Sequence, residues 1–183
     1  MRSGKGVAVG ALLKAIHDAA RGLRTEINLS TESPWGRELS AIRTEISNML
    51  KAEIDSLPGR VRRLLRPRPA KEITPAARLD STDVAETEAL IEFVGICRNY
   101  AGELAINEMT QRVYSDVQNY LDTSTQPLID ALRAAGDTDR AFRHAQVEAA
   151  ARFCAKVFGE DYAATLQKAA DLAAQGERKA AKG

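Results

Sequence analysis

The residues best suited to chemistry in this sequence form one basic cluster. Six cations lie within twelve residues of the run GRVRRLLRPRPAK, namely Arg60, Arg62, Arg63, Arg66, Arg68 and Lys71. We call residues 60–71 the basic segment, and no acidic residue occurs within it. Such a density of positive charge can neutralise several phosphates of a nucleic acid, in a contact that weakens steeply as salt is added.

Three interpretations of the basic segment stay open from the sequence. The segment can contact protein, by lying within the chain against the acidic first part of the helix expected to begin at Ser81. It can bind nucleic acid, although no aromatic residues are interleaved with the arginines to stack on bases. It can also dock on an anionic membrane surface, with Val61, Leu64 and Leu65 facing the lipid.

Other chemistries lack their characteristic residues. Neither His17 nor His144 belongs to an HExxH or ExxH metal motif, and no glycine-rich phosphate loop or GxSxG occurs. Cys97 and Cys154 each lie in an apolar helical pattern without a CxxC, which is typical of buried free thiols in a reducing compartment. The sequence therefore predicts no enzyme activity, no metal site and no cofactor. A helical enzyme with a pocket at the centre of its bundle is a further alternative without a motif to support it.

The composition predicts that helices position these residues. The chain is 44% hydrophobic and 28% charged but only 5% aromatic, and it is rich in alanine, a residue that favours helix. Apolar residues recur at spacings of three and four, and no segment shows the alternation of a strand. We expect an all-α fold, with an N-terminal antiparallel helical hairpin plus a C-terminal helical bundle built on one long helix.

The hairpin is expected to have arms at about Val7–Ile27 and Pro34–Leu57, with Ser33 capping the second arm. A seam of spacing 4, 3, 4, 3 predicts the interface between the arms, formed by Trp35, Leu39, Ile42, Ile46 and Met49. Pro58–Gly59 is expected to end the second arm, and a short basic helix follows it.

The bundle is expected to begin with one helix from Ser81 to Leu121, capped among residues 80–83. Pro127 is predicted to open a short helix that ends at Gly136. Two further helices follow, and they are expected to end at Phe158 and Ala174.

Prolines and charge predict the domain organisation. Residues 67–80 are expected to form an extended linker, because they contain Pro67, Pro69 and Pro75. The linker would separate a basic hairpin over 1–66 from an acidic bundle over 81–175. A disordered tail is expected over 176–183. Residues 1–79 carry 15 Lys and Arg against 8 Asp and Glu, a net +7, whereas residues 80–183 carry 11 against 17, a net −6. The two halves can therefore attract each other, within one chain or between copies.

These observations favour a non-enzymatic helical protein-interaction or scaffold protein that self-associates. The alternative is a nucleic-acid-associated protein that binds phosphates through Arg60–Arg68. No apolar run approaches the roughly 18–20 residues of a membrane span. Near the N-terminus, Lys14 interrupts the apolar run and no cleavage site of the A-x-A type follows, so we expect a cytoplasmic location.

Overall fold

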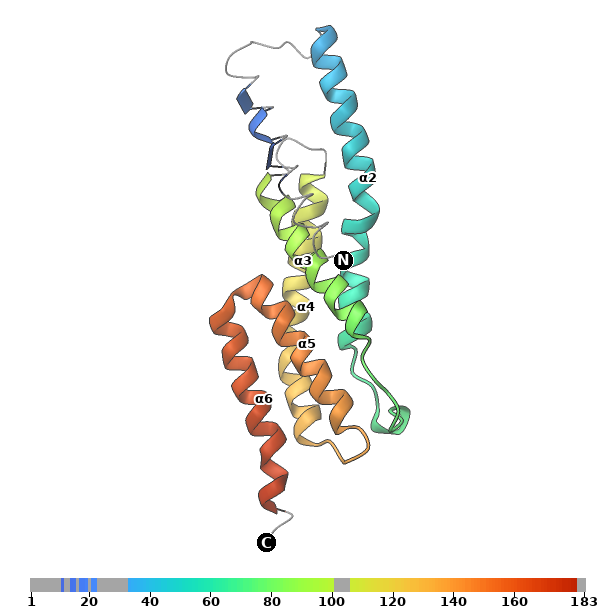
Figure 1. Cartoon of the computed structure of the whole chain (residues 1–183), viewed down its shortest axis with the longest axis vertical. Coiled ribbons are helices and arrows are strands. Elements are labelled where there is room, and N and C mark those ends of the chain that lie inside the picture. The colour runs from blue at the N-terminus through green and yellow to red at the C-terminus, as the bar shows by residue number, and fades with distance from the viewer. Residues whose placement is uncertain are drawn as a thin grey trace. The chain divides into compact units, whose positions relative to one another are not determined.

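The protein is all-α, as predicted, in a computed structural model that describes residues 11, 14–15, 17–19, 21–22, 33–100 and 106–180; of residues 100 and 175–180 it describes only the backbone. The helices are α2 (Pro34–Leu65), α3 (Ser81–Tyr100), α4 (Asn107–Arg133), α5 (Arg140–Phe158) and α6 (Glu160–Ala180), with a short 3₁₀ helix, η1 (Ala70–Glu72), between α2 and α3 (Figure 1). No strand occurs in this part of the chain. The expected hairpin followed by a bundle is broadly consistent with this arrangement.

The chain divides into two compact units, and each unit is built from two stretches of sequence. Unit 1 comprises Met1–Pro58 and Ala89–Ser115, and unit 2 comprises Gly59–Glu88 and Asp116–Gly183. Helices α2, α3 and α4 each contribute residues to both units. The proline-rich segment 67–80 lies inside unit 2 and contains η1.

Local capping chemistry sets several helix ends. The Ser33 hydroxyl accepts a hydrogen bond of 3.0 Å from the backbone N–H of Gly36 at the start of α2. Before α3, Asp80 Oδ1 accepts from the N–H groups of Thr82 at 2.8 Å and Asp83 at 3.3 Å. Each bond satisfies a donor that has no partner within the helix, so these two predicted starts are confirmed.

Gly159 ends α5 as predicted, because its backbone adopts a φ of +97°. This is a conformation that side chains with a Cβ rarely adopt. The glycine lets α6 begin at the next residue. Figure 1 shows α5 and α6 lying side by side in unit 2. Helix α6 extends to Ala180, beyond the predicted end at Ala174.

The prediction of one helix from Ser81 to Leu121 is wrong. α3 ends at Tyr100, Ile106 lies in a turn, and α4 begins at Asn107. Two contacts of Arg98 show that the chain reverses within unit 1. Its Nε lies 3.1 Å from Gln111 Oε1, and its guanidinium lies over the ring of Tyr114. Since Gly95 also lies next to Tyr114, the end of α3 runs antiparallel to the start of α4.

The prediction that Pro58–Gly59 ends the second arm is also wrong. α2 continues through it to Leu65. A proline costs a helix interior about 3 kcal/mol relative to alanine. The flanking residues Ile54, Leu57 and Val61 are all at most 1% exposed, and burying each side chain contributes about 1.5–3 kcal/mol. Their packing outweighs the cost of the proline.

Pro127 likewise lies inside α4 and does not open a new helix. Its missing N–H removes one hydrogen bond from the turn before it. In that turn, hydroxyl groups supply additional donors. Thr123 Oγ1 lies 2.9 Å from the carbonyl oxygen of Asn119, and the buried Ser124 Oγ lies 3.4 Å from that of Leu121. Bonds of this kind tend to bend a helix rather than stabilise it. The neighbouring Leu121, Leu128 and Ile129 are at most 5% exposed, and their packing keeps the helix continuous through Pro127.

The buried residues of unit 2 explain its compactness. α5 buries Phe142, Val147, Phe153 and Cys154, as its wide apolar arc predicts. α6 faces it mainly through small residues and Leu166. Small side chains at the contact let two helices approach closely.

Candidate functional site

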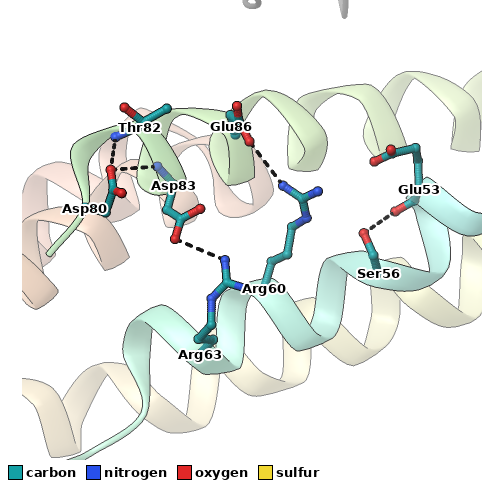
Figure 2. A network of polar contacts seen from close by, with 8 residues as sticks. All are labelled: Glu53, Ser56, Arg60, Arg63, Asp80, Thr82, Asp83 and Glu86. Atoms are coloured by element: carbon teal, nitrogen blue, oxygen red, sulfur yellow. Dashed lines mark hydrogen bonds and ion pairs between the residues drawn. The ribbon is translucent and has the colours of Figure 1, made fainter.

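The structure places the whole basic segment in unit 2, at the end of α2 and in the turns that follow it. Two of its arginines pair with carboxylates of α3 (Figure 2). Arg60 Nη1 lies 3.5 Å from Glu86 Oε2, and Arg63 Nη2 lies 3.2 Å from Asp83 Oδ2. The expectation that the segment lies against the acidic first part of this helix is confirmed.

Two other arginines lie over aromatic rings. The Arg62 guanidinium carbon is 5.7 Å from the centre of the Tyr120 ring, on α4, and that of Arg68 is 5.3 Å from the centre of the Phe142 ring, on α5. Both distances allow cation–π attraction. Burial raises the pKa of Tyr120, while the positive charge of Arg62 acts in the opposite direction. These arginine–ring contacts could not be predicted from the sequence, because the rings lie more than 55 residues from the arginines along the chain.

Two buried side chains of α5 hold the backbone of the segment. Gln146 Nε2 donates to the carbonyl oxygens of Leu64 at 3.0 Å and Arg66 at 3.2 Å. Arg143 Nη2 donates to the carbonyl oxygen of Arg68 at 3.1 Å. These bonds satisfy carbonyls near the end of α2 that lack helical partners. The sequence offered one sign of this role. Arg143 and Gln146 are three residues apart, so they share one face of a largely apolar helix.

Arg143 carries its own counterion. Its Nε donates to the carboxylate of Asp139, which directly precedes α5. Arg143 is 7% exposed and Asp139 is 4% exposed. A buried charge needs a close partner because its desolvation is costly. The pair therefore allows Arg143 to sit beneath the basic segment.

The apolar residues of the basic segment are not available to lipid. Val61 and Leu65 are 0% exposed and Leu64 is 5% exposed. The membrane-docking interpretation required these three side chains to face the lipid, and the structure instead places them in the core. No helix in the described ranges is both long and apolar enough to cross a bilayer.

The predicted hairpin interface divides into two groups. Leu39 and Ile46 are half-buried, whereas Trp35, Ile42 and Met49 are 77%, 47% and 73% exposed. Most of the first arm, 7–27, lies outside the described residues, so the pairing of the two arms stays a prediction. We call the three exposed residues the α2 stripe. Their spacing of seven places them along one line of the helix.

Unit 2 also contains an open groove of about 640 Å³ between the start of α3 and helices α5 and α6. Six alanines line it, namely Ala145, Ala149, Ala151, Ala155, Ala163 and Ala164. Its charged side chains include Arg152, whose Nε lies 3.0 Å from Glu88 Oε2. Ligand sites usually present convergent polar groups to the ligand, whereas these two groups bind each other.

Metal-binding geometry is not found among the described residues, where no group of three or more His, Cys, Asp and Glu side chains could hold an ion. His144 Nδ1 instead lies 3.4 Å from Glu148 Oε1, one helical turn along α5. The two cysteines are buried free thiols, as the sequence predicts.

Burial should make both cysteines unreactive. It raises the pKa of the Cys97 thiol from 9.0 to about 12, and burial together with the charge of Asp122 raises that of Cys154 to about 12. This lowers the thiolate fraction at pH 8 about a thousandfold. We expect iodoacetamide to modify neither thiol of the folded protein at pH 8 on the timescale that modifies the urea-unfolded chain. Rapid modification without denaturant would contradict the burial.

The same shifts have a consequence for stability. The folded state holds these protons more tightly than the unfolded state. The contribution of the two protonated thiols to the free energy of unfolding is therefore complete below pH 9, and it is lost as the pH rises from 9 towards 12. The urea midpoint should therefore be lower at pH 10.5 than at pH 8.

Comparisons of the chain with known proteins give no match among protein-family models, curated proteins or solved structures.

Proposed function

We propose that the protein is a non-enzymatic helical interaction protein that self-associates by pairing the α2 stripe with that of a second copy. The observation that supports this function is the exposure of Trp35, Ile42 and Met49 on one line of α2. A single exposed apolar residue is ordinary on a protein surface. Three large ones at a spacing of seven form the repeat by which helices pair.

The charges beside the stripe favour a parallel pair of α2 helices. Glu38 and Glu45 are exposed and each lies three residues after a stripe residue. An antiparallel pair centred on Ile42 would bring Glu38 of one copy near Glu45 of the other, and like charges repel. In a parallel pair each stripe residue meets its own counterpart, and this repulsion is avoided.

The experiment compares the molar mass of the protein with that of two variants, by light scattering after gel filtration at tens of micromolar. We expect the wild type to elute at about twice its 19.9 kDa. The Trp35→Ser/Met49→Ser variant should elute as a monomer, because it removes two of the three large side chains of the stripe, and truncating one anchor residue can cost an interface about 2 kcal/mol or more. That cost corresponds to about a thirtyfold rise in the dissociation constant.

Leu172 provides the matched control. It is 70% exposed on α6, so Leu172→Ser removes a similarly exposed apolar side chain away from the stripe. The Leu172→Ser variant should keep the wild-type mass. A monomeric wild type, or equal dissociation of the stripe and control variants, would rule out pairing through α2.

A further inference from the structure

We infer that the basic segment contains two sets of cations with different roles, and that Arg62, Arg66, Arg68 and Lys71 bind the phosphate backbone of nucleic acid. We call these four residues the open set, and Arg60 and Arg63 the paired set. The inference concerns unit 2 alone and does not depend on pairing through α2.

The ion pairs separate the two sets. Arg60 and Arg63 contact Glu86 and Asp83 on α3 (Figure 2). None of the four cations of the open set contacts a carboxylate in the part of the chain that the structure describes. Arg62, Arg66 and Lys71 are exposed and Arg68 is half-buried. The open set therefore retains four positive charges for an external anion.

The rings of Tyr120 and Phe142 position two of these charges. A ring occupies the flat face of the guanidinium above it, at 5.7 Å for Arg62 and 5.3 Å for Arg68. The N–H donors of a guanidinium lie in its plane, so stacking leaves them able to bind oxyanions. A stacked arginine also loses less conformational freedom when it binds a phosphate.

The contacts from α5 remove a local obstacle to anion binding. The C-terminal end of a helix carries partial negative charge on its last carbonyl groups, which repels phosphate. Gln146 binds the carbonyls of Leu64 and Arg66, and Arg143 binds that of Arg68. These donors offset the partial charge and fix the backbone that carries the open set.

Burial favours nucleic acid over membrane as the partner. Lipid docking combines basic residues with exposed apolar side chains, but Val61, Leu64 and Leu65 are buried. The large apolar side chains of unit 2 that are exposed, Tyr162 and Leu172, lie on α6. Contact with a phosphate backbone requires only the charges.

The test measures binding of a labelled 20-base-pair DNA by fluorescence anisotropy between 50 and 200 mM salt. Four phosphate contacts predict a slope of log K against log salt near −3.6. The matched variants are Arg62→Gln/Arg66→Gln and Arg60→Gln/Arg63→Gln, which remove the same charge from the same helix end. We expect the slope of the first to become shallower by about 1.8, from the loss of two contacts, and that of the second to stay within about 0.5 of the wild type.

Three outcomes would overturn the inference. The wild type could fail to bind DNA at 50 mM salt. Both double variants could lose the same slope, which would mean that net charge alone drives binding. Vesicles of phosphatidylcholine and phosphatidylserine could retain the wild type but not the Arg62→Gln/Arg66→Gln variant while DNA does not bind, which would assign the open set to a membrane. Circular dichroism of each variant checks that the fold is intact.

Discussion

Replacing Asp139 with alanine is expected to lower the free energy of unfolding by about 3–5 kcal/mol. Asp139 provides the carboxylate for Arg143, and both residues are more than 90% buried. Without it, Arg143 would keep its charge in a site that water scarcely reaches. The Arg143 guanidinium would still contact the carbonyl of Arg68, but a neutral carbonyl cannot replace a counterion.

Asp130 is the matched control for this prediction. It pairs with Arg133 in α4 at 2.8 Å, with both side chains more than half exposed. Water screens such a pair, so Asp130→Ala should cost at most about 1 kcal/mol. Urea denaturation followed by circular dichroism compares the two variants. If their midpoints coincide, the Asp139–Arg143 pair does not behave as a buried one.

Replacing Gln146 with leucine is expected to lower the free energy of unfolding by roughly 1–3 kcal/mol. The substitution keeps the size of the side chain and removes the amide that donates to two backbone carbonyls. The bond to Leu64 is buried, so that carbonyl would lose its donor without gaining water. The bond to Arg66 is partly exposed, and water can replace it.

Gln126 offers the same substitution in an exposed place. Its amide donates to Asp130 one turn along α4 at 3.0 Å, and Gln126→Leu should change the stability by less than about 0.5 kcal/mol. Hydrogen exchange adds a local measurement, because Gln146→Leu should speed exchange at the end of α2 before global unfolding. Unchanged exchange there would show that Gln146 does not anchor the basic segment.

Local chemistry made part of the fold predictable. Ser33, Asp80 and Gly159 act within four residues of themselves, so their sequence context contains the cause of a helix start or end. Pro58 and Pro127 were misinterpreted because the opposing cause, packing against distant segments, lies elsewhere in the chain.

The reversal between α3 and α4 is the converse error, because here a helix ends without a strong local signal. Residues 101–106, AGELAI, contain no proline and a single glycine, Gly102. One glycine costs a helix only about 1 kcal/mol, so an apolar pattern that continues across it predicts an unbroken helix. Tertiary contacts such as that of Arg98 with Tyr114 hold the end of α3 against the start of α4.

The basic segment was recognised from its charge, and its contact with the acidic helix followed from simple attraction. The division between paired and open cations could not be foreseen. Arg62 and Arg63 are neighbours in sequence but point about 100° apart around a helix. One therefore reaches Tyr120 on α4 and the other reaches Asp83 on α3.

Unit 2 is built from two separate stretches of the chain, and this has a consequence during protein synthesis. Leu64 and the side chain that holds its carbonyl, Gln146, are separated by 82 residues. At about 5–20 residues per second, the ribosome needs roughly 4–16 s to make the intervening chain. For that time the end of α2 lacks the donors of α5, and unit 2 cannot close until translation has passed Gln146. A chain released early, before α5, would leave the carbonyls of Leu64, Arg66 and Arg68 without the donors that Gln146 and Arg143 supply.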